Sequence, residues 1–438
     1  MLDVLKNRTY RHLFLAQVIA LVGTGLATVA LGLLAYDIAG AEAGAVLGTA
    51  LAIKMVAYVS VAPIAGAFAE VLPRRPLLVA LDLIRAAVAI CLPFVTEVWQ
   101  VYVLIFVLQS ASAAFTPTFQ ATIPDVLTAE KDYTKALSLS RLAYDLESVI
   151  SPMLAAALLA VMSFHNLFAG TVVGFLGSAA LVVSVLLPSP KSSERRGIYD
   201  RTTRGLKIYL ATPRLRGLLA LSLAVSAAGS MVIVNTVVLV QSEFGFAQRA
   251  TALALAAFGG GSMVAAMLLP RVLEDIADRK TMLAGALVLV IGLLLGTIVQ
   301  SYTLLLPLWF ALGLGYSLAQ TPSGRLLRRS SQPEDRPSLF AAQFALSHAC
   351  WLITYPAAGW LGARIGLPAT FGVLALLAAV AVVVATRIWP SQDPNKLRHS
   401  HEDLELDHPH LQGGGRWHSH VFVIDKHHSQ WPVLHDGR

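Results

Sequence analysis

Charge is scarce in this chain of 438 residues. Only 13% of the residues are Asp, Glu, Lys or Arg, whereas 56% are hydrophobic, and the mean hydropathy is +0.66. Soluble globular domains carry about 25% charged residues. The composition therefore excludes an ordinary soluble domain and indicates a chain that lies mostly in lipid.

Cysteines and catalytic motifs are also few. Cys91 and Cys350 both fall in apolar stretches, so a disulfide framework and a Cys-x-x-Cys metal or redox motif are excluded. The glycines 259–261 follow no strand and lack the Lys-Ser/Thr pair of a P-loop, so direct use of ATP is not expected. The loops supply no nucleophile, base and orienting group, and no basic face is interleaved with aromatics. We therefore expect neither an enzyme nor a nucleic-acid-binding protein.

Long apolar stretches fill most of the chain. Each stretch is near or above the roughly 20 residues that cross a hydrocarbon core of about 30 Å. They run approximately over residues 13–36, 43–69, 76–95, 98–119, 137–162, 167–187, 217–240, 250–270, 281–299, 302–320, 338–361 and 366–389. We predict an all-α membrane protein with twelve transmembrane helices and the lipid bilayer as its main partner.

Basic residues are distributed unevenly among the loops. They gather at the N-terminus, in the loops after even-numbered stretches and in the central segment, whereas the opposite loops carry only Arg249 and Arg364. By the positive-inside rule both termini are cytoplasmic. The chain then divides into a six-helix bundle (1–188), a cytoplasmic central loop (189–213), a second six-helix bundle (214–390) and a cytoplasmic tail (391–438). A bacterial inner membrane fits this multi-pass, basic chain.

The two halves repeat one motif. Glu70 precedes the basic pair Arg74-Arg75 by four and five residues, and Asp275 precedes Arg279-Lys280 by the same spacing. Parallel repeats of this kind imply two bundles that move about a site near the membrane midplane.

The first copy of the motif resembles the loop between helices 2 and 3 of the major facilitator superfamily. Gly66, Glu70, Arg74 and Arg75 match the family pattern, whereas Val71 and Pro73 replace its Arg and Gly. The resemblance covers nearly all of residues 1–390 and implies the major facilitator fold. It also implies that the family's cytoplasmic latch is formed here by Gly66, Glu70, Arg74, Arg75, Asp275, Arg279 and Lys280.

Further segments look like the efflux branch that includes siderophore and drug exporters. These are Ile123-Pro124-Asp125 and the pair Asp82 and Arg85, which we expect to form an ion pair. Proton-coupled antiporters of the family carry Gly-x-x-x-Gly-Pro-x-x-Gly-Gly in helix 5, where this chain has Glu147, Ser151, Pro152, Ala155 and Ala156. Small residues preserve the packing, but a carboxylate replaces the first glycine.

Five polar residues lie about 14 to 17 Å from the ends of the predicted helices, near the midplane. A charge at that depth costs about 2.5 to 3.5 kcal/mol, so such residues usually face a cavity or a partner. We expect them to line the transport path, with Lys54 as a counter-ion. Alternatively, Lys54 permanently neutralises one acid and Arg141 pairs with Asp145 along the helix. The five are Lys54, Gln109, Asp145, Glu147 and His348.

Histidines crowd the tail, interleaved with acids. Imidazole suits nickel, zinc and copper, so we expect a divalent metal there and no other cofactor. Low apolar content and Gly413-Gly-Gly415 predict a flexible segment that orders on binding. A solvated or a pH-sensitive tail are the alternatives. The candidate ligands are His399, His401, His408, His410, His418, His420, His427 and His428.

These patterns favour a monomeric, proton-coupled efflux transporter whose substrate is a divalent metal such as nickel or an organic solute. The His-rich tail resembles that of nickel-resistance exporters of the superfamily. Three alternatives stay open: a drug or siderophore exporter whose tail is regulatory, an uptake carrier, and a membrane-anchored metal sensor.

Overall fold

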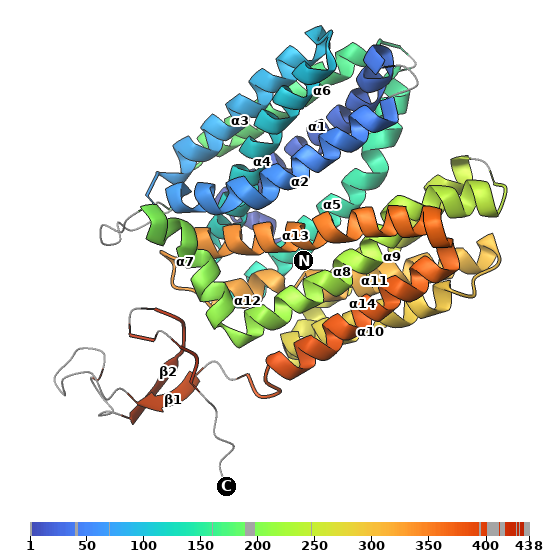
Figure 1. Cartoon of the computed structure of the whole chain (residues 1–438). Coiled ribbons are helices and arrows are strands. Elements are labelled where there is room, and N and C mark those ends of the chain that lie inside the picture. The colour runs from blue at the N-terminus through green and yellow to red at the C-terminus, as the bar shows by residue number, and fades with distance from the viewer. Residues whose placement is uncertain are drawn as a thin grey trace.

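The computed structural model describes residues 2–39, 43–69, 71–159, 161–188, 198–246, 248–393, 396–400, 411, 417–425, 427–428 and 430–432. Within these residues the chain is almost entirely helical. Figure 1 shows two groups of helices that converge on the side of α7 and the tail and diverge on the opposite side. We call the convergent side the tail side.

In its described residues the N-terminal group holds six α-helices and three short 3-10 helices. They are η1 (Leu2–Lys6), α1 (Arg8–Ala39), α2 (Ala43–Ala69), α3 (Arg74–Cys91), η3 (Leu92–Phe94), α4 (Val98–Val126), α5 (Glu130–Leu159), η4 (Phe164–Asn166) and α6 (Leu167–Val183). Close helix contact fixes the group: a Cβ at Gly174 would lie 3.0 Å from Gly23 Cα, and Thr171 Oγ1 donates to the carbonyl of Gly23 at 2.8 Å. Small residues let α1 and α6 approach in this way.

The C-terminal group repeats the arrangement with one extra short helix. Its elements are α8 (Pro213–Val237), the π-helix η5 (Val238–Glu243), α9 (Gln248–Asp275), α10 (Asp278–Gly296), α11 (Tyr302–Gln320), α12 (Ser323–Arg329), α13 (Arg336–Ile365) and α14 (Leu367–Ile388). A Cβ at Gly261 would overlap the carbonyl of Phe310, and one at Gly313 would overlap that of Phe258. Backbone packing of α9 on α11 therefore explains Gly261, whereas a Cβ at Gly260 would meet only ordinary contacts at 3.9 Å.

Each predicted apolar stretch largely coincides with one long helix. Among the described residues, ten helices are long and apolar enough to cross a membrane. The other two long helices are α5 and α13, each of 30 residues. They carry more polar side chains than their neighbours, and they are the helices that contact the opposite group, α5 on α9 and α13 on α2.

The central segment contains a helix where a loop was predicted. α7 (Ile198–Ala211) buries Ile208 and Tyr209, and the hydroxyl of Tyr209 donates to Gln343 Oε1 of α13 at 2.5 Å. Gly205 lies so close to the backbone of Ser338 that a Cβ would overlap it. Residues 198–211 therefore form a helix that packs on α13, with Gly205 at the point of closest approach.

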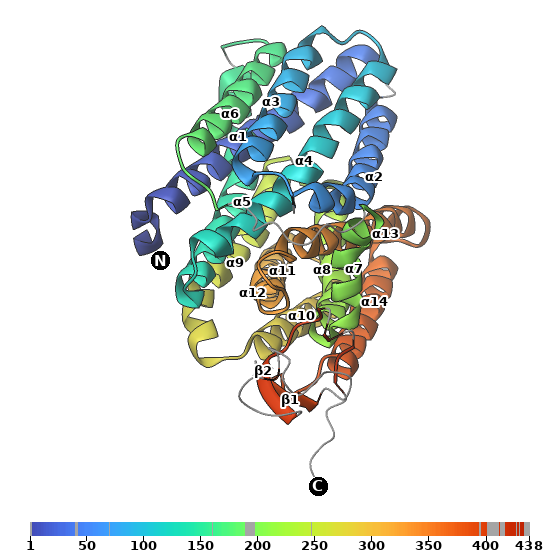
Figure 2. The same ribbon diagram turned by 90° about the vertical axis from the view of Figure 1, so that its left-hand side faces the viewer.

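The described part of the tail forms a small sheet; the prediction of a segment that orders on binding stays a prediction, because much of the segment, including Gly413–Gly415, lies outside the described residues. β1 (Lys396–Ser400) pairs antiparallel with β2 (Trp417–Val421), with His399 opposite His418. The sheet lies against the C-terminal helices (Figure 2). Buried apolar side chains of the tail and of α8 and α14 form one cluster, which includes Leu397, Phe422, Ile424, Leu215, Leu218 and Trp389.

Candidate functional site

The five predicted path residues separate into different environments. Asp145 is buried and pairs with Arg141 one turn earlier in α5, at 2.5 Å between Nη2 and Oδ1. Arg141 Nε also donates to Ser262 Oγ of α9 at 3.0 Å, and its guanidinium lies 4.7 Å from the centre of the Tyr316 ring. The alternative pairing of Arg141 with Asp145 is therefore present, and the pair belongs to the contact between the two groups of helices.

Glu147 is half-buried and lies against α1. A methyl group at Gly25 would overlap both Glu147 Oε1 and Ser151 Oγ, so the missing side chain makes room for the carboxylate. Glu147 also hydrogen-bonds to the side chain of Ser151 and interacts electrostatically with Lys54. A half-buried acid and a half-buried base thus lie within electrostatic reach of each other.

His348 and Lys54 lie near the second contact between the groups. The His348 ring is 4.7 Å from the centre of the Tyr58 ring and 4.1 Å from that of Phe344, and its Nδ1 pairs with the carbonyl of Phe344 at 2.7 Å. Lys54 Nζ lies 5.5 Å from the centre of the Tyr58 ring. Gln109 is half-buried in α4. His348 therefore serves the packing of α13 on α2, against Tyr58, which lies one turn after Lys54 in α2.

The predicted latch residues of the first repeat lie on the tail side. Gly66 packs against α13, where a Cβ would lie 2.6 Å from that of Ala341. Arg74 is buried and pairs with Asp125 at the end of α4, and Arg336 at the start of α13 pairs with the same carboxylate. We call this set (Arg74, Asp125, Arg336) the Asp125 network. It joins the two groups of helices.

Two other residues of the first repeat lie elsewhere. Arg75 Nη2 donates to the carbonyl of Val183, which keeps it within the N-terminal group. Glu70 lies outside the described residues. Arg74 forms its ion pair with Asp125. The sequence by itself marks Asp125 only as part of the segment Ile123-Pro124-Asp125, which looks like the efflux branch.

The second repeat uses a different acid from the one predicted. Asp275 and Lys280 are exposed, and Arg279 donates to the carbonyl of Trp389 at 3.1 Å. Asp278 is buried instead, and it begins α10. The repeat spacing pointed to Asp275, but burial at the helix start selects Asp278.

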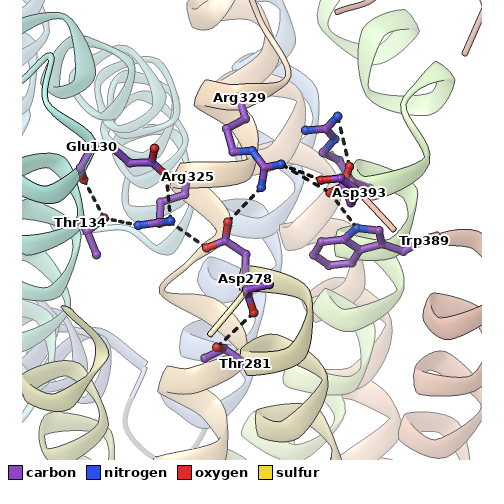
Figure 3. Close-up of polar contacts among 10 residues, drawn as sticks. Glu130, Thr134, Asp278, Thr281, Arg325, Arg329, Trp389 and Asp393 are labelled. Carbon is purple, nitrogen blue, oxygen red and sulfur yellow. Dashed lines mark hydrogen bonds and ion pairs between the residues drawn. The ribbon is translucent and has the colours of Figure 1, made fainter. Parts of the chain in front are cut away.

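Asp278 is the centre of a second network on the tail side (Figure 3). Its carboxylate pairs with Arg325 Nε at 2.8 Å and with Arg329 Nη1 at 3.2 Å. Arg325 reaches across to α5, where it pairs with Glu130 at 2.8 Å and donates to Thr134 Oγ1 at 2.6 Å. We call this set (Glu130, Asp278, Arg325, Arg329) the Asp278 network, and it also joins the two groups.

The tail continues the Asp278 network. Arg329 Nη2 donates to the carbonyl of Asp393 at 3.2 Å, and the Asp393 carboxylate receives Arg214 at 3.3 Å and Trp389 Nε1 at 3.1 Å. The Arg214 guanidinium lies 4.9 Å from the centre of the Trp431 ring. Polar contacts therefore run without a break from α5 to the tail.

Four tail histidines gather at the sheet. His399, His418 and His420 each offer a ligand atom, and these atoms lie within 4.8 Å of one another. His428 Nε2 lies 3.0 Å from His399 Nε2. We call these four residues the histidine cluster. Of the other predicted ligands, His427 is exposed, and His401, His408 and His410 lie outside the described residues.

The cluster has an unusual electrostatic environment. Burial lowers the pKa of His399 to about 4; the hydrogen bond to the carbonyl of Leu397 opposes this, and the neighbouring histidines add to it. Partial burial acts to raise the pKa of Asp425, but the hydrogen bond with the His428 ring and those from the backbone N–H groups of His427 and His428 outweigh burial and lower it to about 2. His399 is therefore neutral and Asp425 ionised at neutral pH.

Comparison with known proteins identifies the family. The family model of the Major Facilitator Superfamily matches residues 13–232 and 218–419, so the chain belongs to this superfamily. It is a membrane transporter of that class and not an enzyme.

Two curated relatives agree with this assignment. An uncharacterized MFS-type transporter, YfiS, of Bacillus subtilis (strain 168) is 22% identical over 347 residues, which span 75% of this chain and 82% of the relative. Macrolide efflux protein A of Enterococcus faecalis is 26% identical over 152 residues, which span 32% of this chain and 47% of that protein.

Solved structures share the fold at low sequence identity. The human organic anion transporter MFSD10 (TETRAN) superimposes with a TM-score of 0.75 at 14% identity, covering 86% of this chain and 99% of the other. A bacterial homologue of the iron transporter ferroportin, in an outward-facing state, superimposes with a TM-score of 0.73 at 14% identity. The superposition covers 88% of this chain and 100% of the homologue's chain.

Proposed function

We propose that this transporter is a secondary active, proton-coupled exporter of a small organic solute. The observation that carries the proposal is the pair of half-buried opposite charges, Lys54 and Glu147, beside the two contacts that join the groups of helices. A carboxylate that can exchange its proton between two sides of a membrane is what such coupling requires. The macrolide efflux relative supports the direction of transport.

The proposal places twelve helices across the inner membrane with both termini in the cytoplasm. α5 and α13 are about 45 Å long at 1.5 Å per residue, enough to cross. Their polar residues are directed to the contacts between the groups rather than to lipid, which explains their lower hydropathy. The tail side then faces the cytoplasm, as the basic residues there suggest.

In this arrangement the cytoplasmic side is closed. Both networks hold the two groups together on the tail side, and the contacts of Tyr58 and Arg141 join them nearer the middle of the helices, whereas the groups diverge on the other side (Figure 1). Alternating access then requires the two networks to open while contacts form on the outer side. The ferroportin homologue in an outward-facing state, with its similar fold, supports this reading.

Glu147 would carry the coupling proton. Protonation removes the charge that interacts with Lys54, which frees Lys54 to meet an acceptor group on the solute or to be shielded as the path closes. Asp145 is a poorer choice because Arg141 already holds it in an ion pair. Gly25 keeps the space that Glu147 needs, so its size is part of the site.

A divalent metal as cargo is the second candidate, and the histidine cluster is the observation that favours it. Within the described residues, however, the only group of three or more His, Cys, Asp or Glu suited to a metal lies in the tail and not between the helices. A divalent cation without its water shell needs several such ligands on its way between the helices. An organic solute therefore fits the described residues between the two groups of helices better than a metal ion does.

Inside-out vesicles with an imposed proton gradient test the proposal. We expect gradient-dependent accumulation of a fluorescent macrolide or organic cation. In Glu147→Gln this gradient-driven accumulation should fall at least tenfold. The exposed acid Glu243 gives a matched control, because Glu243→Gln removes one charge from α8's extension without touching the pair. Solute exchange without a gradient should persist in Glu147→Gln. Gradient-driven accumulation of nickel instead of the organic probes would favour metal as cargo.

A further inference from the structure

Rings of the histidine cluster have the outer hydrogen-bond partners that are typical of a metal site. Nδ1 of His399 lies 3.1 Å from the carbonyl of Leu397, Nδ1 of His420 lies 2.9 Å from that of Val421, and Nδ1 of His428 lies 2.8 Å from Asp425 Oδ1. Carbonyl and carboxylate oxygens only accept, so each Nδ1 must donate its proton. In the neutral rings Nε2 then carries the lone pair that binds metals.

This arrangement is the one that orients metal-binding imidazoles in proteins. A ligating histidine typically donates its other N–H to a backbone carbonyl or a carboxylate, which fixes the ring and its tautomer. Asp425 is itself fixed by the backbone N–H groups of His427 and His428, at 2.9 and 3.0 Å. The outer contacts for three of the four rings are therefore in place.

The contact between His399 and His428 needs a positive charge. Their Nε2 atoms lie 3.0 Å apart, although both Nδ1 atoms donate elsewhere, so two lone pairs would face each other in the neutral rings. Either a shared proton or a cation between the rings removes this repulsion. His418 and His420 lie beside the same point, with ring centres 4.7 and 4.6 Å from that of His399.

We propose that His399, His418, His420 and His428 bind a single divalent transition metal ion of the zinc class. Four nitrogen ligands suit tetrahedral Zn²⁺, with Zn–N distances of about 2.0 to 2.1 Å. In that geometry the four nitrogens lie about 3.3 Å apart. The ligand atoms of His399, His418 and His420, now within 4.8 Å of one another, would move closer, and the Nε2 atoms of His399 and His428, now 3.0 Å apart, would separate slightly. The ion joins β1, β2 and the segment that follows β2.

The bound ion also fixes the tail against the helices that carry the Asp278 network. Phe422 packs against His399 and His428, with ring centres 4.9 and 4.5 Å away, and against Trp431 at 5.1 Å. Trp431 lies over Arg214, which pairs with Asp393, and Asp393 receives Arg329. Metal in the tail therefore strengthens the contacts that keep the tail side closed, which makes the site regulatory.

Titration of the purified full-length protein tests the site. With Co²⁺ as a spectroscopic probe, we expect one ion per chain with the intense visible absorption of a tetrahedral complex, displaced by Zn²⁺. The triple variant His399→Ala/His418→Ala/His420→Ala should lose at least 100-fold in Zn²⁺ affinity. Asp425→Asn, which changes only the orienting partner of His428, should lose about tenfold.

A matched variant separates a built site from a diffuse collector. His427→Ala removes an exposed tail histidine next to His428, and we expect its Zn²⁺ affinity to stay within threefold of the wild type, whereas His428→Ala should lose at least tenfold. Equal losses in His427→Ala and His428→Ala, or an unchanged affinity in the triple cluster variant, would overturn the proposed site. Neither result depends on whether the protein transports an organic solute.

Hydrogen exchange tests the connection to the helices. Zn²⁺ should slow amide exchange in the tail sheet and in residues 322–331 of the wild type, and in neither segment of the cluster variant. Asp393→Asn should keep its Zn²⁺ affinity within threefold but lose the slowing in 322–331. If Zn²⁺ slows exchange in the wild-type sheet alone, the connection to the Asp278 network is wrong.

Discussion

The two networks on the tail side are charge-inverted copies of each other. In the Asp125 network a base begins α3, an acid ends α4, and a base comes from the opposite group at the start of α13. In the Asp278 network an acid begins α10, a base follows α11, and an acid comes from the opposite group at the start of α5. Three members of each network thus occupy similar places at the helix ends with opposite signs of charge, and Arg329 is an additional base of the Asp278 network.

The comparison shows that alternation of charge matters more than the identity of any residue. Each network places one sign between two groups of the other sign, and each joins the two halves of the transporter. They differ in burial: Arg336 is 13% exposed, whereas Glu130 is 52% exposed. They differ also in reach, because only the Asp278 network continues into the tail. The predictions below use these differences.

Removal of the central acid should have the largest effect. Asp125→Asn leaves Arg74 and Arg336 facing each other without the acid they share, and breaking a buried pair in this way costs about 3 to 5 kcal/mol. We expect a clear drop in the thermal unfolding temperature in detergent and faster opening of the tail side. Asp37→Asn, at an exposed position in α1, is the control and should change little. An unchanged unfolding temperature in Asp125→Asn would show that the network is not a stabilising contact.

Replacing the residue that each network receives from the opposite group should have the next largest effects, and these two effects should differ in size. Arg336→Gln removes a buried charged hydrogen bond, about 2 kcal/mol, whereas Glu130→Gln removes a half-exposed partner, about 0.5 kcal/mol. Spin labels at the exposed positions Leu72 and Gln332 report the separation of the two groups on the tail side. We expect a larger open population in Arg336→Gln than in Glu130→Gln. The reverse order would mean that burial does not set the strength of the two networks.

Loss of Trp431 should weaken only the network that reaches the tail. Trp431→Ala removes the ring under Arg214 and the contact with Phe422, worth about 1 kcal/mol together. Amide exchange should quicken in the tail strands and change little in α7, which packs beside the Asp125 network through Arg204 and Asp335. Trp431→Phe should retain most of the protection. Equal loosening of α7 would contradict the separation of the two networks.

The exposed pair between the groups should have the smallest effect. Lys131 and Glu274 pair at 2.8 Å, with 66% and 49% of their side chains exposed, so water and salt screen the attraction. Lys131 lowers the pKa of Glu274, so any contribution is present above the ordinary carboxylate pKa and is lost as the pH falls below it. Lys131→Gln should leave the unfolding temperature unchanged at about 0.15 M salt. A marked, salt-independent drop would show that this pair belongs with the two buried networks.

The sequence predicts the positions of the helices better than the contacts between their side chains. The apolar stretches coincide with the long helices, because a helix in lipid needs about 20 apolar residues whatever its neighbours. The resemblance of the motif beginning at Gly66 led to the superfamily, which the family comparison confirms. The predicted ion pair of Asp82 with Arg85 is present too. These features depend on local composition and spacing, which the sequence contains directly.

The strands of the tail are not among the elements predicted from the sequence. The run Val421-Phe-Val-Ile424 is apolar and begins in a strand. Such a run next to alternating His418 and His420 is a strand signal. The low apolar content of the tail as a whole hides this local pattern.

The sequence by itself determined the membrane class, the helices, the repeated halves and the supply of histidines, because hydropathy and spacing act along the chain. Only the tertiary structure decided that Asp278 rather than Asp275 is buried, that Asp145 is held by Arg141 while Glu147 lies within electrostatic reach of Lys54, and that four histidines converge. These choices depend on which side chains meet across helices far apart in the chain, where burial and the need to pair each charge select one partner among several candidates.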